Sequence, residues 1–97
     1  KRQHLDCKLV VVLGHNHCGA VEAAIKHDSD GHIKYITDDI REAIKEEKDE
    51  YIATCLNVKH SVKVIEDNTD MKLLEEKGLE VIGAVYHLED GHVEFLE

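Results

Sequence analysis

The stretch VVVLGHNHCGA, residues 10–20, decides both the fold and the chemistry of this 97-residue chain. The aliphatic run at residues 9–13 predicts a short strand buried on both faces of a parallel sheet. Residues 14–19 predict a turn, and residues 20–27 predict a helix. Because ligands bind at the carboxyl ends of strands in open parallel sheets, His15 and Cys18 are candidate site residues.

The region after this turn predicts helices. Thr37 is a candidate cap for a helix that continues to about Asp67. The charged run KEEKDE, residues 45–50, is most simply a solvated part of that helical stretch. Asn68 or Thr69 can cap a short helix that stops at Gly78.

The last twenty residues predict two strands. Residues 79–88 are apolar, and the Asp-Gly pair at 90–91 is a strong hairpin signal that returns residues 93–96 antiparallel. The order of elements predicts an α/β fold, with a mainly parallel sheet flanked by helices and an antiparallel C-terminal edge strand. Residues 1–97 are expected to form one domain.

The composition excludes several kinds of partner. The formal charge of −9 argues against nucleic acid or an anionic membrane, because both require basic patches. No apolar run is long enough for a transmembrane helix, so we expect no membrane insertion by this segment. Three widely spaced cysteines do not form a disulfide framework, and they favour a reducing, cytoplasmic location.

His15 and Cys18 are a plausible pair of zinc ligands. Cys18 opens a helix, whose positive end favours the thiolate that binds metal, and imidazole with thiolate suits tetrahedral Zn²⁺. The adjacent Gly19 leaves a backbone N–H accessible to a small anion. In the alternative interpretation, Cys18 is an inert buried thiol and His15 is a hydrogen-bonded loop residue, because motifs this short recur by chance.

A catalytic zinc requires three protein ligands, and the sequence supplies no convincing third one. His17 lies between the two candidates and is expected to point away from a metal that they share. The other candidates are expected elsewhere: Cys7 at the far end of the sheet, Cys55 in the core, His87 and His92 in solvent, and His4, His27, His32 and His60 on the surface.

Three segments together resemble the β-class carbonic anhydrases. LVVVLGHNHCGAV, residues 9–21, is similar to the family's second zinc-ligand motif, a strand ending in G-H-x-x-C-G. NVKHSVKVI, residues 57–65, resembles its Asn-Val helix, and residues 78–97 resemble its C-terminal strand pair. The resemblance implies that His15 and Cys18 are two of three protein zinc ligands and that Gly19 helps to shape the substrate pocket.

The chain departs from the family at one motif. C-x-D-x-R supplies the remaining cysteine ligand and an Asp–Arg pair, and it occurs nowhere in these residues. In the family, the strand that carries it pairs beside the strand predicted here at residues 9–13, so that edge would be unpaired. The chain also begins without methionine. We therefore expect the C-terminal portion of a longer protein, an incomplete domain with part of a zinc site.

The leading functional hypothesis is a zinc-dependent carbonic anhydrase, a lyase that hydrates CO₂ reversibly to bicarbonate. This segment alone is expected to be poorly active, and its catalytic base cannot be assigned. The resemblance also implies a homo-oligomer. The first alternative is a degenerate, non-catalytic module with an assembly or regulatory role, for instance within an anion-transporter polypeptide. The second is a metal-buffering module that uses His15, His17 and Cys18.

Overall fold

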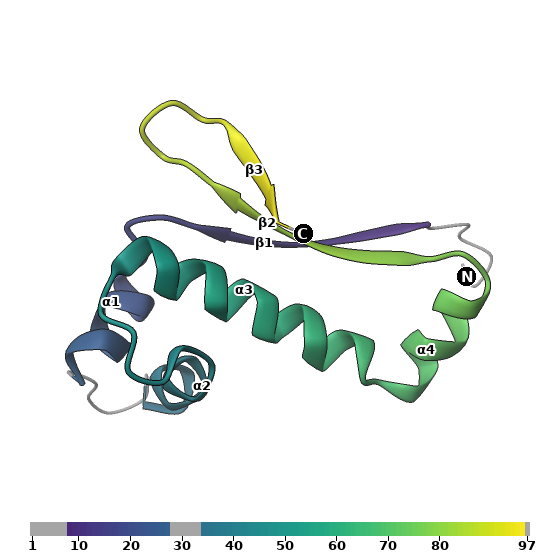
Figure 1. Ribbon diagram of the computed structural model, residues 1–97, viewed down its shortest axis with the longest axis horizontal. Coiled ribbons are helices and arrows are strands. Elements are labelled where there is room, and N and C mark those ends of the chain that lie inside the picture. The colour runs from purple at the N-terminus through teal and green to yellow at the C-terminus, as the bar shows by residue number, and fades with distance from the viewer. Residues whose placement is uncertain (1–7, 28–33, 97) are drawn as a thin grey trace.

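The computed structural model describes residues 8–27 and 34–96, and these form a mixed sheet covered by helices (Figure 1). The sheet has the order β1-β2-β3, with β1 at Leu9–His15, β2 at Glu80–Tyr86 and β3 at Val93–Leu96. Strands β1 and β2 are parallel, whereas β2 and β3 form an antiparallel pair. The predicted α/β fold with an antiparallel C-terminal strand is confirmed.

Four helices are present in the described residues: α1 at Gly19–Lys26, α2 at Lys34–Ile44, α3 at Glu50–Glu66 and α4 at Thr69–Glu76. None of those helices is both long and apolar enough to cross a membrane. The predicted helix at residues 20–27 is confirmed as α1, to within one residue at each end.

The helical region between residues 37 and 67 differs from the prediction in two ways. Thr37 is not a cap, because it lies fully buried within α2 and its hydroxyl donates to the carbonyl of Lys34 at 3.1 Å. In the charged run, residues 45–49 are not helical, and only Glu50 belongs to a helix, as the first residue of α3. Helix α2 ends at Ile44, and the next residue, Lys45, has a left-handed φ of 56°. Asp49 starts α3 by accepting a hydrogen bond from the amide of Ile52.

The short helix α4 is bounded as expected. The side chain of Asn68 accepts hydrogen bonds from the amides of Asp70 and Met71, so Asn68 is its N-cap. The chain leaves α4 through Gly78, whose φ of 106° is open to glycine and strained for other residues. The same freedom is used in the hairpin, where Gly91 has a φ of 80°.

Helix α3 packs directly against the sheet because two glycines leave room for it. A Cβ atom added to Gly14 on β1 would lie 2.6 Å from Val58, and one added to Gly83 on β2 would lie 2.7 Å from the same side chain. Val58 is only 3% exposed. A second apolar cluster joins α1, α2 and the start of α3, and its buried members are Val21, Ala24, Ile40, Ile44 and Ala53.

In the part of the chain that the structure describes, the opposite face of the sheet is open to solvent. All four helices lie on one side of β1 and β2 (Figure 1), so alternate strand residues have no helix over them. The large apolar side chains exposed on this face are Leu9, Val11, Leu13, Val93 and Phe95. The predicted burial of β1 on both faces is therefore wrong for this chain, since the described residues supply only one helical layer.

Candidate metal centre

The candidate zinc ligands lie where β1 ends and α1 begins. His15 is the last residue of β1 and is paired with Tyr86 of β2. The amide of the next residue, Asn16, donates to the carbonyl of Tyr86 at 3.2 Å, which continues the pairing by one step. The site is thus at the carboxyl end of the two parallel strands, where ligands bind in sheets of this kind.

The imidazole of His15 has one ring nitrogen engaged. Its Nδ1 atom lies 2.8 Å from the backbone oxygen of Asn16. A carbonyl oxygen only accepts hydrogen bonds, so Nδ1 is the donor in this contact, and in the neutral ring Nε2 keeps its lone pair. His15 is exposed, and this tautomer suits a metal ligand that binds through Nε2.

Cys18 is the N-cap of α1 and is half-buried. Its backbone is extended and its side chain makes no capping hydrogen bond. Its amide donates to the Glu50 carboxylate at 3.2 Å, and Cys18 also packs beside the apolar cluster of α1 and α2. Cys18 is a free cysteine, so its thiol is available as a ligand. An imidazole nitrogen and a thiol three residues apart are donors that fit zinc.

Open space adjoins the start of α1. Gly19 is the first residue of the helix, it is exposed, and no atom lies within 4 Å of the position a Cβ would take there. The backbone at Gly19 is therefore accessible to a small ligand.

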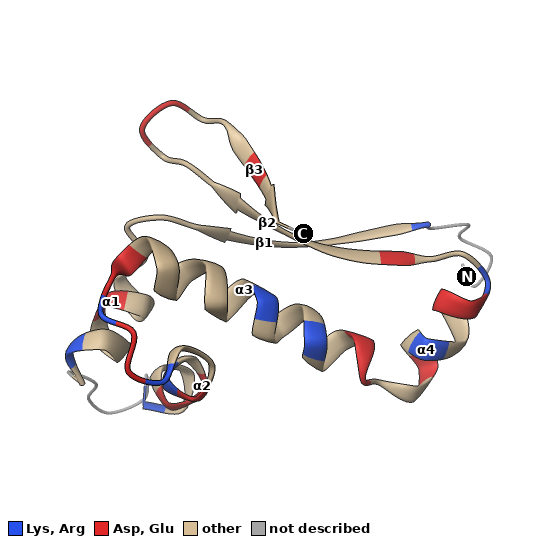
Figure 2. Ribbon diagram, in the orientation of Figure 1, with Lys and Arg blue, Asp and Glu red and all other residues tan. Residues whose placement is uncertain are grey.

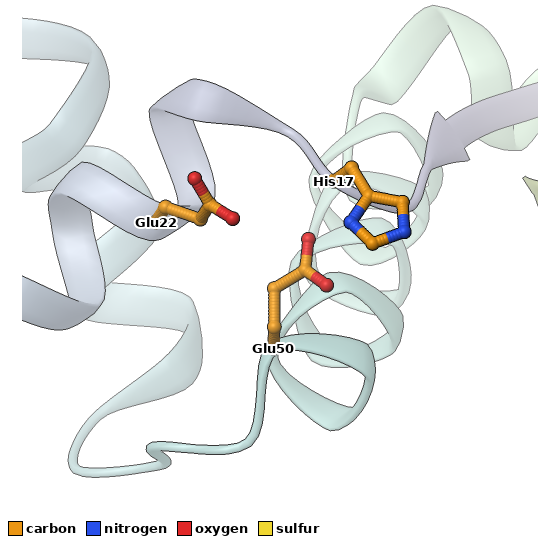
Figure 3. A group of neighbouring side chains, drawn as sticks. All are labelled: His17, Glu22 and Glu50. Carbon is orange, nitrogen blue, oxygen red and sulfur yellow. The ribbon is translucent and has the colours of Figure 1, made fainter. Parts of the chain in front are cut away.

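His17 does not lie in a potential metal-binding group with His15 and Cys18. Its φ of 55° turns the loop, and its ring faces Glu22 of α1 and Glu50 of α3 (Figure 3). One potential ligand atom from each of these three residues lies within 4.8 Å of the others. Among the described residues, no such group of three contains His15 or Cys18. Glu50 follows His17 by more than thirty positions, so nothing in the sequence predicted this grouping.

The second polar cluster lies beside the same loop, at the hairpin between β2 and β3. Its tip is acidic (Figure 2). His87 is not in solvent as expected, because its side chain is only 12% exposed between Glu89 and Glu94. The hydrogen bond to Glu94, and then the contact with Glu89, raise the pKa of His87. His92 stacks on His87 with ring centroids 4.2 Å apart, and its own side chain is 55% exposed.

The remaining candidates add no third ligand within the residues that the structure describes. Cys55 is half-buried on α3, His27 is exposed after α1, and His60 is half-buried on α3. Cys7, His4 and His32 lie outside the described residues.

Comparison with known proteins identifies the fold. A sequence model of the family described as carbonic anhydrase matches residues 2–93. The crystal structure of the β-carbonic anhydrase CafA of the fungal pathogen Aspergillus fumigatus superimposes with a TM-score of 0.81 and 28% identity, covering 97% of this chain and 50% of that one. A Coccomyxa β-carbonic anhydrase in complex with acetazolamide gives 0.82 and 26%, covering 97% and 49%.

A β-carbonic anhydrase from the filamentous ascomycete Sordaria macrospora, described as tetrameric, matches with a TM-score of 0.70 and 28% identity, covering 96% of this chain and 54% of that chain. The chain therefore spans about half the length of the solved enzymes that it matches. No curated protein sequence matches it.

Proposed function

Because this chain belongs to the β-carbonic anhydrase family, we propose that it carries part of the zinc site of an enzyme that hydrates CO₂ reversibly to bicarbonate. The observation that supports this most directly is the arrangement at the end of β1. His15 donates a hydrogen bond from Nδ1 to a backbone carbonyl, which leaves its Nε2 atom available. Cys18 is the N-cap residue of the helix that follows, and it carries a thiol.

In this proposal His15 and Cys18 hold Zn²⁺, and the backbone at Gly19 borders the site of CO₂ or bicarbonate. The metal, when bound, supplies the Lewis acidity that activates water at neutral pH. His15 keeps its orientation through the carbonyl of Asn16, and Cys18 is fixed by the hydrogen bond that its backbone amide donates to the Glu50 carboxylate.

The proposal treats residues 1–97 as a single, partial domain. The sequence contains no C-x-D-x-R motif, and two protein ligands do not complete a catalytic zinc shell. We therefore expect the 97-residue chain on its own to bind zinc weakly and to hydrate CO₂ poorly. A homo-oligomeric assembly and a cytoplasmic location belong to the same proposal. The open sheet face supports the first, and the free thiols of Cys18 and Cys55 support the second.

The deciding experiment combines zinc content, measured by mass spectrometry, with stopped-flow CO₂ hydration on the purified chain. We expect substoichiometric zinc that falls further in His15→Ala and Cys18→Ser, with slow turnover. His17→Ala is the matched control and should retain zinc. Stoichiometric zinc with rapid turnover would show that the site is complete in this chain. Zinc lost in His17→Ala would favour the metal-buffering alternative, because only that model uses His17 as a ligand.

A further inference from the structure

The loop between β1 and α1 is held on both sides by residues from distant parts of the chain. Asn16 is 8% exposed, and its Nδ2 atom donates to Glu89 at 2.6 Å. Its Oδ1 atom accepts from the amide of Leu88 at 2.9 Å. Both ends of the Asn16 amide are therefore bound to the β2–β3 hairpin. On the other side of the loop, the amide of Cys18 donates to Glu50 on α3.

The hairpin that binds Asn16 is itself fixed to α3. His87 lies 3.4 Å from Glu89 through Nδ1 and 2.9 Å from Glu94 through Nε2. Glu94 also accepts a hydrogen bond from the hydroxyl of Tyr51 at 2.7 Å. Tyr51 is the neighbour of Glu50, so the contacts run from the loop through the hairpin to the start of α3 and return to the loop at Cys18.

Asn16 also contacts the metal-ligand candidate directly, because its backbone oxygen is the acceptor for His15 Nδ1. A shift of Asn16 would move the group that fixes the His15 tautomer. The bond from Asn16 is also the main reason that the pKa of Glu89 is lowered, so Glu89 is an ionised acceptor at neutral pH. Hydrogen bonds to charged groups are among the stronger ones in proteins.

We propose that Asn16 is a positioning residue, whose side chain, clamped by Glu89 and Leu88, holds the loop in the conformation that presents His15 and Cys18 to the metal. The clamp consists only of hydrogen bonds within the protein, so it can order the loop before a metal binds, and the entropy of ordering is then not lost in the binding step. The inference rests on the proposed function for the identity of the ligands, whereas the effect of the clamp on the loop does not.

A reciprocal exchange of the two side chains tests the clamp. Asn16→Asp places two carboxylates against each other, and amide hydrogen exchange at Asn16 and Cys18 in the metal-free chain should become about tenfold faster. Glu89→Gln should change little, because its amide oxygen still accepts from Asn16. In the double variant the carboxylate and the amide have changed places, so the hydrogen bond re-forms in the opposite direction and exchange should return to within about twofold of the parent. A double variant as fast as Asn16→Asp overturns the proposal.

A second pair of variants avoids altering the buried residue. Glu89 is exposed and can be replaced by alanine without loss of core packing. Asp90→Ala is its matched control, since Asp90 contacts His92 in the same hairpin and not the loop. We expect faster loop exchange in Glu89→Ala and parental exchange in Asp90→Ala. Equal rates of amide hydrogen exchange in the loop of Glu89→Ala and of Asp90→Ala would contradict the proposal. This comparison does not depend on whether Asn16→Asp folds.

Cobalt(II) affinity, measured by competition with a chelator, separates this inference from the proposed function. The affinity should fall about tenfold in Asn16→Asp and recover in the double variant with Glu89→Gln. A parent chain that binds no metal through His15 and Cys18 counts against the proposed function, while loop exchange still decides whether the clamp orders the loop. Faster loop exchange with unchanged metal affinity would overturn the positioning role.

Discussion

Gly14 and Gly83 are the positions at which the sheet leaves no room for a side chain. Both face Val58 of α3, and an added Cβ would lie less than 3.0 Å from it in each case. Val58 is buried, so it cannot move into solvent to relieve the overlap. We expect Gly14→Ala to lower the free energy of unfolding by about 1–3 kcal/mol, measured by urea denaturation. Gly19→Ala is the control, because open space surrounds that position. Equal urea midpoints for the two variants would contradict the packing argument.

His87 gives the stability of the chain a dependence on pH. Its folded-state pKa is raised above the ordinary value of 6.5, first by Glu94 and then by Glu89. The titratable groups around it are Tyr51, Glu89, Asp90, His92 and Glu94. A raised histidine pKa means that the folded chain favours the protonated ring. Its contribution is therefore fully present below about pH 6.5 and is lost as the pH rises through the folded-state pKa.

The contribution of His87 can be isolated by difference. Urea unfolding of the parent and of His87→Gln between about pH 5.5 and 8.5, roughly one and a half units either side of neutrality, should give curves that converge as the pH rises. His27→Gln removes an exposed histidine outside this cluster and should run parallel to the parent. A difference between the parent and His87→Gln that grows with pH would mean that the ring is held neutral.

The two N-cap residues Asp49 and Asn68 stabilise helices that contribute differently to the core. Asp49 begins α3, which packs on β1 and β2, whereas Asn68 begins α4, which has no buried residue. Loss of either cap should cost about 1 kcal/mol locally. We expect Asp49→Ala to lower the melting temperature of the whole chain. Asn68→Ala should mainly accelerate amide hydrogen exchange within α4, because α4 can fray without exposing a core. A larger drop in melting temperature for Asn68→Ala than for Asp49→Ala would contradict this assignment.

The elements that depend on local signals could be predicted from the sequence. The apolar run of β1, the Asn68 cap and the Asp-Gly turn each specify their own structure within a few residues. Thr37 could not be placed, because burial against other elements decides its position within α2. The break in the charged run could not be placed either, because Lys45 adopts a left-handed φ that no glycine or asparagine signals in the sequence. The same distinction holds at the site. His15 and Cys18 share one short motif, but Glu50 and Glu89 reach the loop only through the tertiary fold.

Residues 8–27 and 34–96 cover only one face of the sheet. Helices lie on one side of β1 and β2, and the other side exposes a row of apolar residues (Figure 1). In the described residues β1 is also an edge strand, so one row of its backbone groups faces no strand. The solved relatives are about twice as long as this chain, and the residues described here place no cover over that face. A chain without that cover should bury the face against another molecule.

Self-association of the purified chain should therefore increase with concentration and depend on the open face. We expect Val11→Lys to shift the sedimentation profile towards monomer, because a charge on the exposed side of β1 opposes burial of that face. Val11 is already 41% exposed, so the folded monomer loses little packing. Leu73→Lys is the matched control, since Leu73 is 55% exposed on α4, which packs against α3 on the side of the sheet that carries the helices (Figure 1). Association that is weakened by Leu73→Lys and not by Val11→Lys would place the contact on the helices, and the open sheet face would then not be the surface that drives assembly.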